Sequence, residues 1–231
     1  MLFLVSRLTY RRLTMTHRLL ADDIAAFQAE MIPTIPEDTM NTLMAELQGL
    51  INLRIAENAL QVGADFPDFS LADADNETRS LGEFLKTGPL VISFYRGAWC
   101  PYCNLEINAL QQRLAEITAA GAQLIAISPQ TPDRSSDQCT KSRLTFEVLS
   151  DIENKLARQC GLVFTLPESL RPIYSAWEID IPGHNGDQSF ELPIPATYIV
   201  DTDGKVRFAF TDMDYTKRLE PDIIIEQLGR L

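Results

Sequence analysis

Short apolar runs that alternate with helical segments constrain the fold of this chain more than any other feature. The run PLVISFY at 89–95 is almost uninterrupted, as in a strand that is buried on both faces of a parallel sheet. A helix is expected from about Pro101 to Ala120, then the run AQLIAIS, a polar helix around Asp133–Arg143 and the run TFEVLS. This alternation predicts βαβ units in an α/β domain.

The remaining segments of the domain have local signals of their own. Ser80 and Glu83 have the spacing of a capping box, which predicts a short helix before the first buried strand. The runs ATYIV and KVRFAF are separated by DTDG, which predicts a hairpin, and EPDIIIEQLGRL predicts a closing helix. The irregular segment at 166–193 is expected to be an insertion into this core.

We predict three parts along the 231 residues. Residues 1–20 are an extension that is either non-structural or a targeting segment, residues 21–62 form an N-terminal helical arm, and residues 63–231 form the main domain. Apolar residues recur in the arm at three- and four-residue steps, as in an amphipathic helix: Met40, Leu43, Met44, Leu47, Leu50, Ile51 and Ile55. This stripe would be buried against the main domain or against a second subunit of a homodimer.

The charge and the cysteine content limit the partners and the compartment. A formal net charge of −12 argues against nucleic acid and anionic membranes as partners. No window approaches the roughly 18 apolar residues of a membrane span, and MLFLV is too short for a secretory signal. Four cysteines indicate a reducing compartment, so we expect a cytoplasmic protein. The arginine-rich start is also compatible with an organelle transit peptide, and Met15 is as good a start as Met1.

Two of the cysteines, Cys100 and Cys103, lie where the first buried strand gives way to its helix. The helix N-terminus favours an anion, so we expect Cys100 to be an accessible, acidic thiol that attacks an electrophile. Cys103 lies one turn further along the same side, where it can displace the product by closing a disulfide. Pro101 suits the first helical position, and Arg96 adds positive charge nearby.

The other polar candidates favour structural roles. A zinc site needs further ligands of suitable spacing, and the sequence supplies only the isolated Cys139 and Cys160 and two distant histidines. We therefore expect Cys139 and Cys160 to be structural or incidental. His184, in the segment PGHNGD, is expected to be a solvated loop residue, and Trp99 a rigid lip at the surface.

The segment FYRGAWCPYC resembles the AhpC/TSA branch of the peroxiredoxins, together with VGADFPDFSL before it and AISPQTPD, LSDIENKLARQCGL and PATYIVDTDG after it. The resemblance extends from about residue 63 to the C-terminus. It implies a thioredoxin-like fold, with a central mixed sheet flanked by helices, and the reduction of hydroperoxides by thiols. It also maps the peroxide-attacking cysteine onto Cys100, and Cys103 onto the second cysteine of a thioredoxin or glutaredoxin pair.

Two positions depart from the family pattern. Where typical members have a proline and an activating threonine or serine before the cysteine, this chain has Ser93 and Gly97. Where they have an arginine before the strand equivalent to ATYIV, it has Pro195, which matches the cis-proline of thioredoxins. We therefore expect a cis bond at Pro195, facing the cysteine pair. Arg96, Trp99, Pro101, Tyr102 and Pro195 are the predicted supporting residues.

These observations predict a thiol-dependent peroxidase that reduces hydrogen peroxide or organic hydroperoxides through Cys100 and Cys103, without a metal or organic cofactor. A thioredoxin-like or glutathione-like donor would reduce the resulting disulfide. A general thiol–disulfide oxidoreductase of the thioredoxin type is the first alternative. The second is a non-enzymatic redox-sensing module, in which the disulfide changes how the arm packs.

Overall fold

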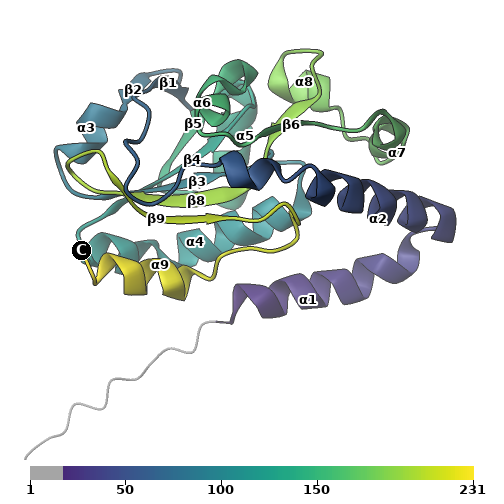
Figure 1. The fold of residues 1–231 in the computed structure, drawn as a ribbon, viewed down its shortest axis with the longest axis horizontal. Helices are drawn as coiled ribbons and strands as arrows, with labels where there is room; N and C mark the ends of the chain where they lie inside the picture. Colours follow the sequence, from purple (N-terminus) through teal and green to yellow (C-terminus); the bar gives the residue numbers. More distant parts are fainter. Residues whose placement is uncertain (1–17) are drawn as a thin grey trace, which may run out of the picture.

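A computed structural model describes residues 18–231 of the chain (Figure 1). The choice between Met1 and Met15, and nearly all of the predicted extension at 1–20, lie outside these residues. Within the described range, seven strands form one sheet: β1 (Ser70–Asp73), β2 (Thr78–Ser80), β3 (Leu90–Phe94), β4 (Gln123–Ser128), β5 (Glu147–Ser150), β8 (Ala196–Val200) and β9 (Val206–Thr211). Their order in the sheet is β2-β1-β5-β4-β3-β8-β9.

The middle of the sheet follows the predicted βαβ pattern. β3 pairs in parallel with β4, and β4 with β5, while β8 runs antiparallel to β3 and β9 antiparallel to β8. Helices α4 (Pro101–Ala119) and α5 (Pro132–Ser142) connect the parallel strands. The mixed sheet with flanking helices confirms the predicted α/β fold class. The hairpin β1–β2 was not predicted, because its two strands are short and largely polar.

Helices cover both faces of the sheet (Figure 1). On one face, α4 and α9 (Pro221–Leu228) pack on alternate residues of the central strands, among them Val91, Leu124 and Ile199. On the other face, α3 (Leu81–Leu85) and α6 (Lys155–Gln159) pack on Ile92, Ile125 and their neighbours. The capping box of Ser80 and Glu83 is present at the start of α3, as predicted.

The segment at 166–193 forms a separate layer of short elements beside the sheet. Strands β6 (Val163–Thr165) and β7 (Glu191–Pro193) pair at its base, and between them lie α7 (Arg171–Ala176) and α8 (Ile181–Asn185). Two single-turn 3-10 helices, at Ile152–Asn154 and Glu168–Leu170, precede α6 and α7 respectively. The side chains of this insertion form an apolar cluster of their own, and Leu50 of the arm belongs to the same cluster.

The arm contains two helices, α1 (Leu20–Met31) and α2 (Glu37–Asn52), together with 3-10 turns at Ile32–Thr34 and Ile55–Asn58. Only the second helix was predicted. α1 packs against α4, and the carboxylate of Glu220 accepts hydrogen bonds from the backbone N–H groups of Leu20 and Ala21 at its N-terminus. α2 packs against the insertion through Leu43 and Leu50. Part of the apolar stripe is therefore buried against the main domain.

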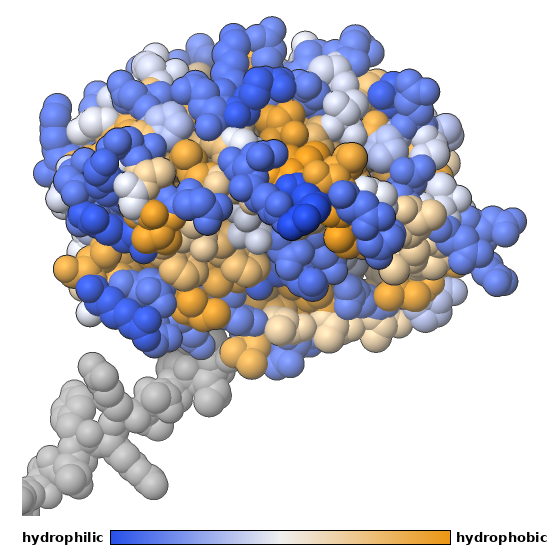
Figure 2. Space-filling view, viewed as in Figure 1, coloured by the Kyte–Doolittle hydropathy of each residue, from blue (hydrophilic) through white to orange (hydrophobic). Residues whose placement is uncertain are grey.

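Other apolar side chains of the arm stay exposed, and Figure 2 shows apolar patches on a largely hydrophilic surface. In the described part of the chain, the large exposed ones within the arm are Met31, Ile32, Met44, Leu53 and Val62. No helix among residues 18–231 is long and apolar enough to cross a membrane.

Candidate active site

The cysteine pair lies at the junction between the central strand β3 and helix α4. Cys100 is the N-cap residue of α4, and Pro101 takes the first helical position. The Cys100 sulfur accepts a hydrogen bond from the backbone N–H of Cys103, at a distance of 3.4 Å. The start of the helix therefore directs a backbone donor at this sulfur, which favours a negative charge there.

Both thiols are fully buried, so the prediction of an accessible Cys100 was wrong. Trp99 and Tyr102 pack on the apolar cluster that contains the pair, and each ring meets a ring from a distant segment. Trp99 lies 5.7 Å from Tyr174 of α7, and Tyr102 lies 5.7 Å from Tyr215, which precedes α9. The helix tip would be open by itself, but the insertion and the loop before α9 cover it. Trp99 is half-buried and forms part of this aromatic cover, so its role as a rigid lip stays a prediction.

Arg96 directs its guanidinium at the Cys100 sulfur, with Nη2 at 3.0 Å. The side chain lies against two aromatic rings, 4.0 Å from the centre of Tyr215 and 5.2 Å from that of Trp99. Only 3% of Arg96 is exposed, and its Nε has no hydrogen-bond partner. Within residues 18–231 no carboxylate forms an ion pair with it. A buried cation without an acidic partner is costly, and a Cys100 thiolate would neutralise it.

A second arginine, Arg218, was not predicted. Its Nη2 lies 3.5 Å from the Cys103 sulfur, and its Nη1 forms an ion pair with Glu106 of α4 at 2.5 Å. Both charged side chains are buried. The only hint in the sequence was Glu106 itself, an acid three residues after Cys103 on the apolar side of the helix.

The two thiols share one negative charge. Burial raises the pKa of both, but the hydrogen bond between them and the guanidiniums of Arg218 and Arg96 lower the pKa at which the pair loses its first proton. Burial, together with the neighbouring cysteine, raises the pKa at which the pair would lose its second proton. The pair therefore loses its first proton more readily than its second, and the lower pKa falls on Cys103 and the higher on Cys100, against the expectation that Cys100 is the more acidic thiol.

A polar network fixes the loop between β3 and the pair. The buried Gln130 side chain accepts a hydrogen bond from the backbone N–H of Ala98 at 2.8 Å, and its Oε1 also lies 3.2 Å from Nδ1 of His184. His184 is thus a half-buried residue of α8, and the expectation of a solvated loop residue was wrong. Gly97 has φ of +146°, and a Cβ there would lie 2.5 Å from the Trp99 ring nitrogen. The loop needs glycine at this position.

Pro195 does not have the predicted cis bond, since every peptide bond in the described part of the chain is trans. The chain runs without reversal from β7 into β8, and Ile194 donates its N–H to the carbonyl of Leu162. A trans bond suits this path, because the cis form of an X-Pro bond costs about 0.5–1 kcal/mol more than trans. The likeness to the cis-proline of thioredoxins is therefore wrong.

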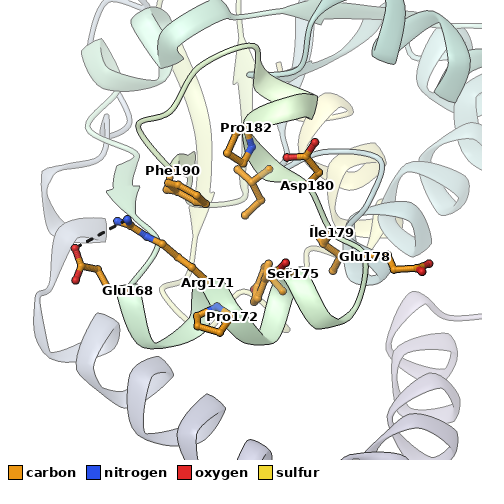
Figure 3. Close-up of a pocket in the computed structure, with 11 residues that line it drawn as sticks. Glu168, Arg171, Pro172, Ser175, Glu178, Ile179, Asp180, Pro182 and Phe190 are labelled. Carbon is orange, nitrogen blue, oxygen red and sulfur yellow. Dashed lines mark ion pairs between the residues drawn. The ribbon is translucent and has the colours of Figure 1, made fainter.

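A surface cavity of about 720 Å³ lies in the insertion, on elements that also cover the pair (Figure 3). The Arg171 side chain lies over the Phe190 ring at 4.3 Å and reaches toward Glu168. Tyr174 belongs to this cavity wall and also contacts Trp99 beside the pair. The Tyr174 ring therefore lies between the cavity and the Trp99 ring, which covers the thiols.

Of the remaining cysteines, Cys139 packs against the apolar cluster that contains the pair, and Cys160 does not. Cys160 is buried in the apolar cluster on the opposite face of the sheet, where burial raises the pKa of its thiol. Cys139 is half-buried on α5, and burial also raises the pKa of its thiol. Among residues 18–231, no three His, Cys, Asp or Glu side chains gather as metal ligands.

Comparison with known proteins shows which family the chain is similar to. Residues 62–209 match the model of the AhpC/TSA family. Peroxiredoxin Bcp of Escherichia coli K12 is 29% identical over 156 residues, which cover 67% of this chain and 88% of that protein. The chloroplastic peroxiredoxin Q of Populus jackii is 28% identical over 165 residues, which cover 71% of this chain and 64% of that protein.

Solved structures show the same fold. The crystal structure of peroxidoxin BcpB from Mycobacterium tuberculosis superimposes with a TM-score of 0.59 at 23% identity, covering 74% of this chain and 98% of that one. A peroxiredoxin-like protein from Aquifex aeolicus has the same TM-score at 17% identity, over 74% of this chain and 88% of that one. These likenesses confirm the thioredoxin-like fold.

Proposed function

The chain belongs to the AhpC/TSA family and is a peroxiredoxin-type thiol peroxidase, and from this premise we propose that Cys100 and Cys103 carry the reaction. The observation that supports these residues most strongly is the Arg96 guanidinium, buried without a carboxylate partner and 3.0 Å from the Cys100 sulfur. Arg218, by contrast, is already neutralised by Glu106. Although the pKa of Cys103 is the lower of the two, we assign the nucleophile to Cys100, because there the charge faces a guanidinium that has no carboxylate partner.

The reaction then proceeds in three steps. The Cys100 thiolate attacks one oxygen of the hydroperoxide, the O–O bond breaks, and the departing alkoxide or hydroxide takes a proton from solvent and leaves as alcohol or water. Cys100 is thereby oxidised by two electrons to a sulfenic acid. The Cys103 thiolate attacks that sulfur, an S–S bond replaces the S–O bond, and the departing hydroxide takes a proton as water. An external thiol donor finally returns two electrons to the disulfide.

The site lacks the activating hydroxyl of typical family members, and two guanidiniums stand in its place. Arg96 faces Cys100 and Arg218 faces Cys103, so N–H donors from two separate segments of the chain face the sulfurs. Donors of this kind stabilise negative charge that develops on an oxygen, and a single one can contribute about 3–4 kcal/mol in other enzymes. Arg96 is thus the proposed replacement for the missing hydroxyl, and Trp99, Tyr102 and Pro101 hold the loop and the helix start around it.

The partners and the division of the chain are proposed on the same basis. Residues 63–231 form the catalytic domain, and the donor is a thioredoxin-like dithiol or a glutathione-like thiol of a reducing compartment such as the cytoplasm. Residues 21–62 form an arm that covers the site, because Phe27 packs on Tyr102 and Gln28 donates a hydrogen bond to the Tyr102 hydroxyl. Its exposed apolar residues would pair with a second copy in a homodimer, which light scattering after size exclusion would detect.

Of the two alternatives, only one keeps support from a contact. The thioredoxin-type oxidoreductase loses its main argument with the trans bond at Pro195. A redox-sensing role retains one, since α1 touches Tyr102 between the two cysteines. In that case oxidation would release the arm and capture a partner without repeated turnover.

The reduced protein, mixed in stopped flow with hydrogen peroxide and separately with a small-molecule disulfide, tests the proposal. We expect peroxide to oxidise the pair faster than the disulfide at equal concentration, with repeated turnover once a dithiol donor is added. Faster reaction with the disulfide would favour the oxidoreductase. A single round of oxidation without turnover, whichever donor is added, would favour the redox sensor.

A further inference from the structure

We propose that Arg218, oriented by Glu106, is the group that stabilises the thiolate of Cys103 when Cys103 attacks the oxidised Cys100. This inference rests on the proposed function, because it assigns a residue to the second of its steps. It concerns a buried ion pair whose arginine lies far from the cysteines in sequence, since Arg218 follows Cys103 by 115 residues.

All three edges of the Arg218 guanidinium have a partner. Nε donates to the carbonyl of Tyr215 at 2.8 Å, Nη1 to the carboxylate of Glu106, and Nη2 faces the Cys103 sulfur. The side chain is 1% exposed, so no solvent competes for these contacts. Two edges hold the planar group in place and the third points at the sulfur, which suits positioning rather than a general charge effect.

The second step requires such a group because Cys103 is fully buried. A buried thiol resists ionisation, since the thiolate loses its hydration. As long as Cys100 carries the shared charge, Cys103 has no need to ionise. Once Cys100 is a sulfenic acid, that charge is gone, and Cys103 is the remaining thiol that faces a guanidinium. Arg218 then compensates the new charge at 3.5 Å.

Glu106 explains why Arg218 does not compete with Arg96 in the first step. The carboxylate neutralises the guanidinium, and both are buried, so the ion pair carries no net charge before the reaction. The guanidinium can still donate a hydrogen bond from its third edge. Burial raises the pKa of Glu106, and Arg218 opposes that rise, which shows that the carboxylate depends on its partner. The ion pair thus favours a thiolate on Cys103 most strongly once the charge on Cys100 has disappeared.

The test measures the two steps separately in the full-length protein. The reduced protein is mixed with excess hydrogen peroxide and quenched in acid at intervals, and mass spectrometry quantifies sulfenic acid and disulfide. Arg218→Met should slow disulfide formation at least about tenfold, because a hydrogen bond to a charged group contributes about 1.5–3 kcal/mol. It should slow the appearance of sulfenic acid much less. Arg218→Lys should restore part of the rate near neutral pH, because it keeps the positive charge without the planar fork.

Two further variants keep the test decisive. Arg113→Met is the matched control, since Arg113 lies on α4, as Glu106 does, and forms ion pairs with Glu116 and Asp222 away from the cysteines. Its disulfide should form at the rate of the unmodified protein. If Arg218→Met folds poorly because Glu106 is left unpaired, the double variant Arg218→Met/Glu106→Gln removes both charges and should show the same slow second step.

The outcomes separate the inference from the function it rests on. Disulfide formation that is as fast in Arg218→Met as in Arg113→Met overturns the role of Arg218 and leaves the peroxidase intact. If Arg218→Met instead slows the first oxidation by as much as the second, Cys103 is the attacking thiol and the proposed roles are reversed. An unmodified protein that forms neither sulfenic acid nor disulfide with peroxide contradicts the proposed function itself.

Discussion

Replacing Arg96 with methionine tests the electrostatic basis of the site. Methionine keeps an apolar chain between the rings of Tyr215 and Trp99 but removes the guanidinium that lies 3.0 Å from the Cys100 sulfur. Because no carboxylate in the described part of the chain pairs with Arg96, the substitution leaves no acidic side chain without its partner. The loss should therefore act on the thiolate rather than on the fold.

The magnitude follows from the contact that is lost. A hydrogen bond to a charged group contributes about 1.5–3 kcal/mol, and one pKa unit corresponds to about 1.4 kcal/mol. Arg96→Met should thus raise the pKa at which the pair loses its first proton by about 1 to 2. At a pH below that pKa, the thiolate population and the rate of peroxide oxidation should fall by about 10- to 100-fold.

The assay is stopped-flow oxidation by hydrogen peroxide over a series of pH values, with circular dichroism melting as a check on folding. The variant should be slow near neutral pH and should approach the unmodified protein at alkaline pH, where both are ionised. Arg96→Lys should be intermediate, because it keeps the charge without the planar fork. An unchanged rate near neutral pH would refute the reasoning. A loss that is equal at every pH would place Arg96 in the transition state rather than in thiol ionisation.

Two further predictions concern the cover of the site and its polar network. Tyr174→Leu removes the ring between the surface cavity and Trp99, so iodoacetamide should alkylate the reduced pair several-fold faster. The control is Ile152→Ala, at an exposed position outside the insertion, and equal rates in the two variants would mean that access lies elsewhere. Burial, reinforced by Arg134, lowers the pKa of His184 in the folded protein below the 6.5 of the unfolded chain. As the pH falls, the unfolded chain therefore takes up the proton first. The stability that the neutral His184 contributes is present above about pH 6.5 and is lost as the pH falls further. His184→Asn should lose less free energy of unfolding than the unmodified protein between about pH 7.5 and about pH 5.5 in denaturant titrations, and equal losses would contradict this.

The elements that could be predicted from the sequence depend on local signals. The central strands are continuous apolar runs, the capping box fixes the start of α3, and Gly121 and Gly204 have the positive φ that their turns require. The junction of strand and helix at Cys100 was predictable for the same reason, since Pro101 and the periodicity of the helix lie beside it.

The surroundings of the pair could not be predicted, because they come from distant segments. Tyr174, Tyr215 and Arg218 lie far along the chain from the cysteines, and their own neighbourhoods in sequence are irregular. Only tertiary packing brings them over the helix tip, and it turns an exposed thiol into a buried one. The cis bond predicted at Pro195 was wrong for a related reason: the residue type permits it, but the straight path from β7 to β8 decides against it.

The most direct test of the account is to identify which cysteine receives the oxygen. Cys103→Ser and Cys100→Ser are each reduced, exposed to one equivalent of hydrogen peroxide with dimedone present, digested and analysed by mass spectrometry. In Cys103→Ser, dimedone should label Cys100, because the sulfenic acid has no partner with which to condense, and turnover should fall. In Cys100→Ser, labelling and peroxide consumption should disappear even though Cys103 is intact. Labelling of Cys103 in the Cys100→Ser protein, with none on Cys100 in the other, would contradict the assignment of the nucleophile.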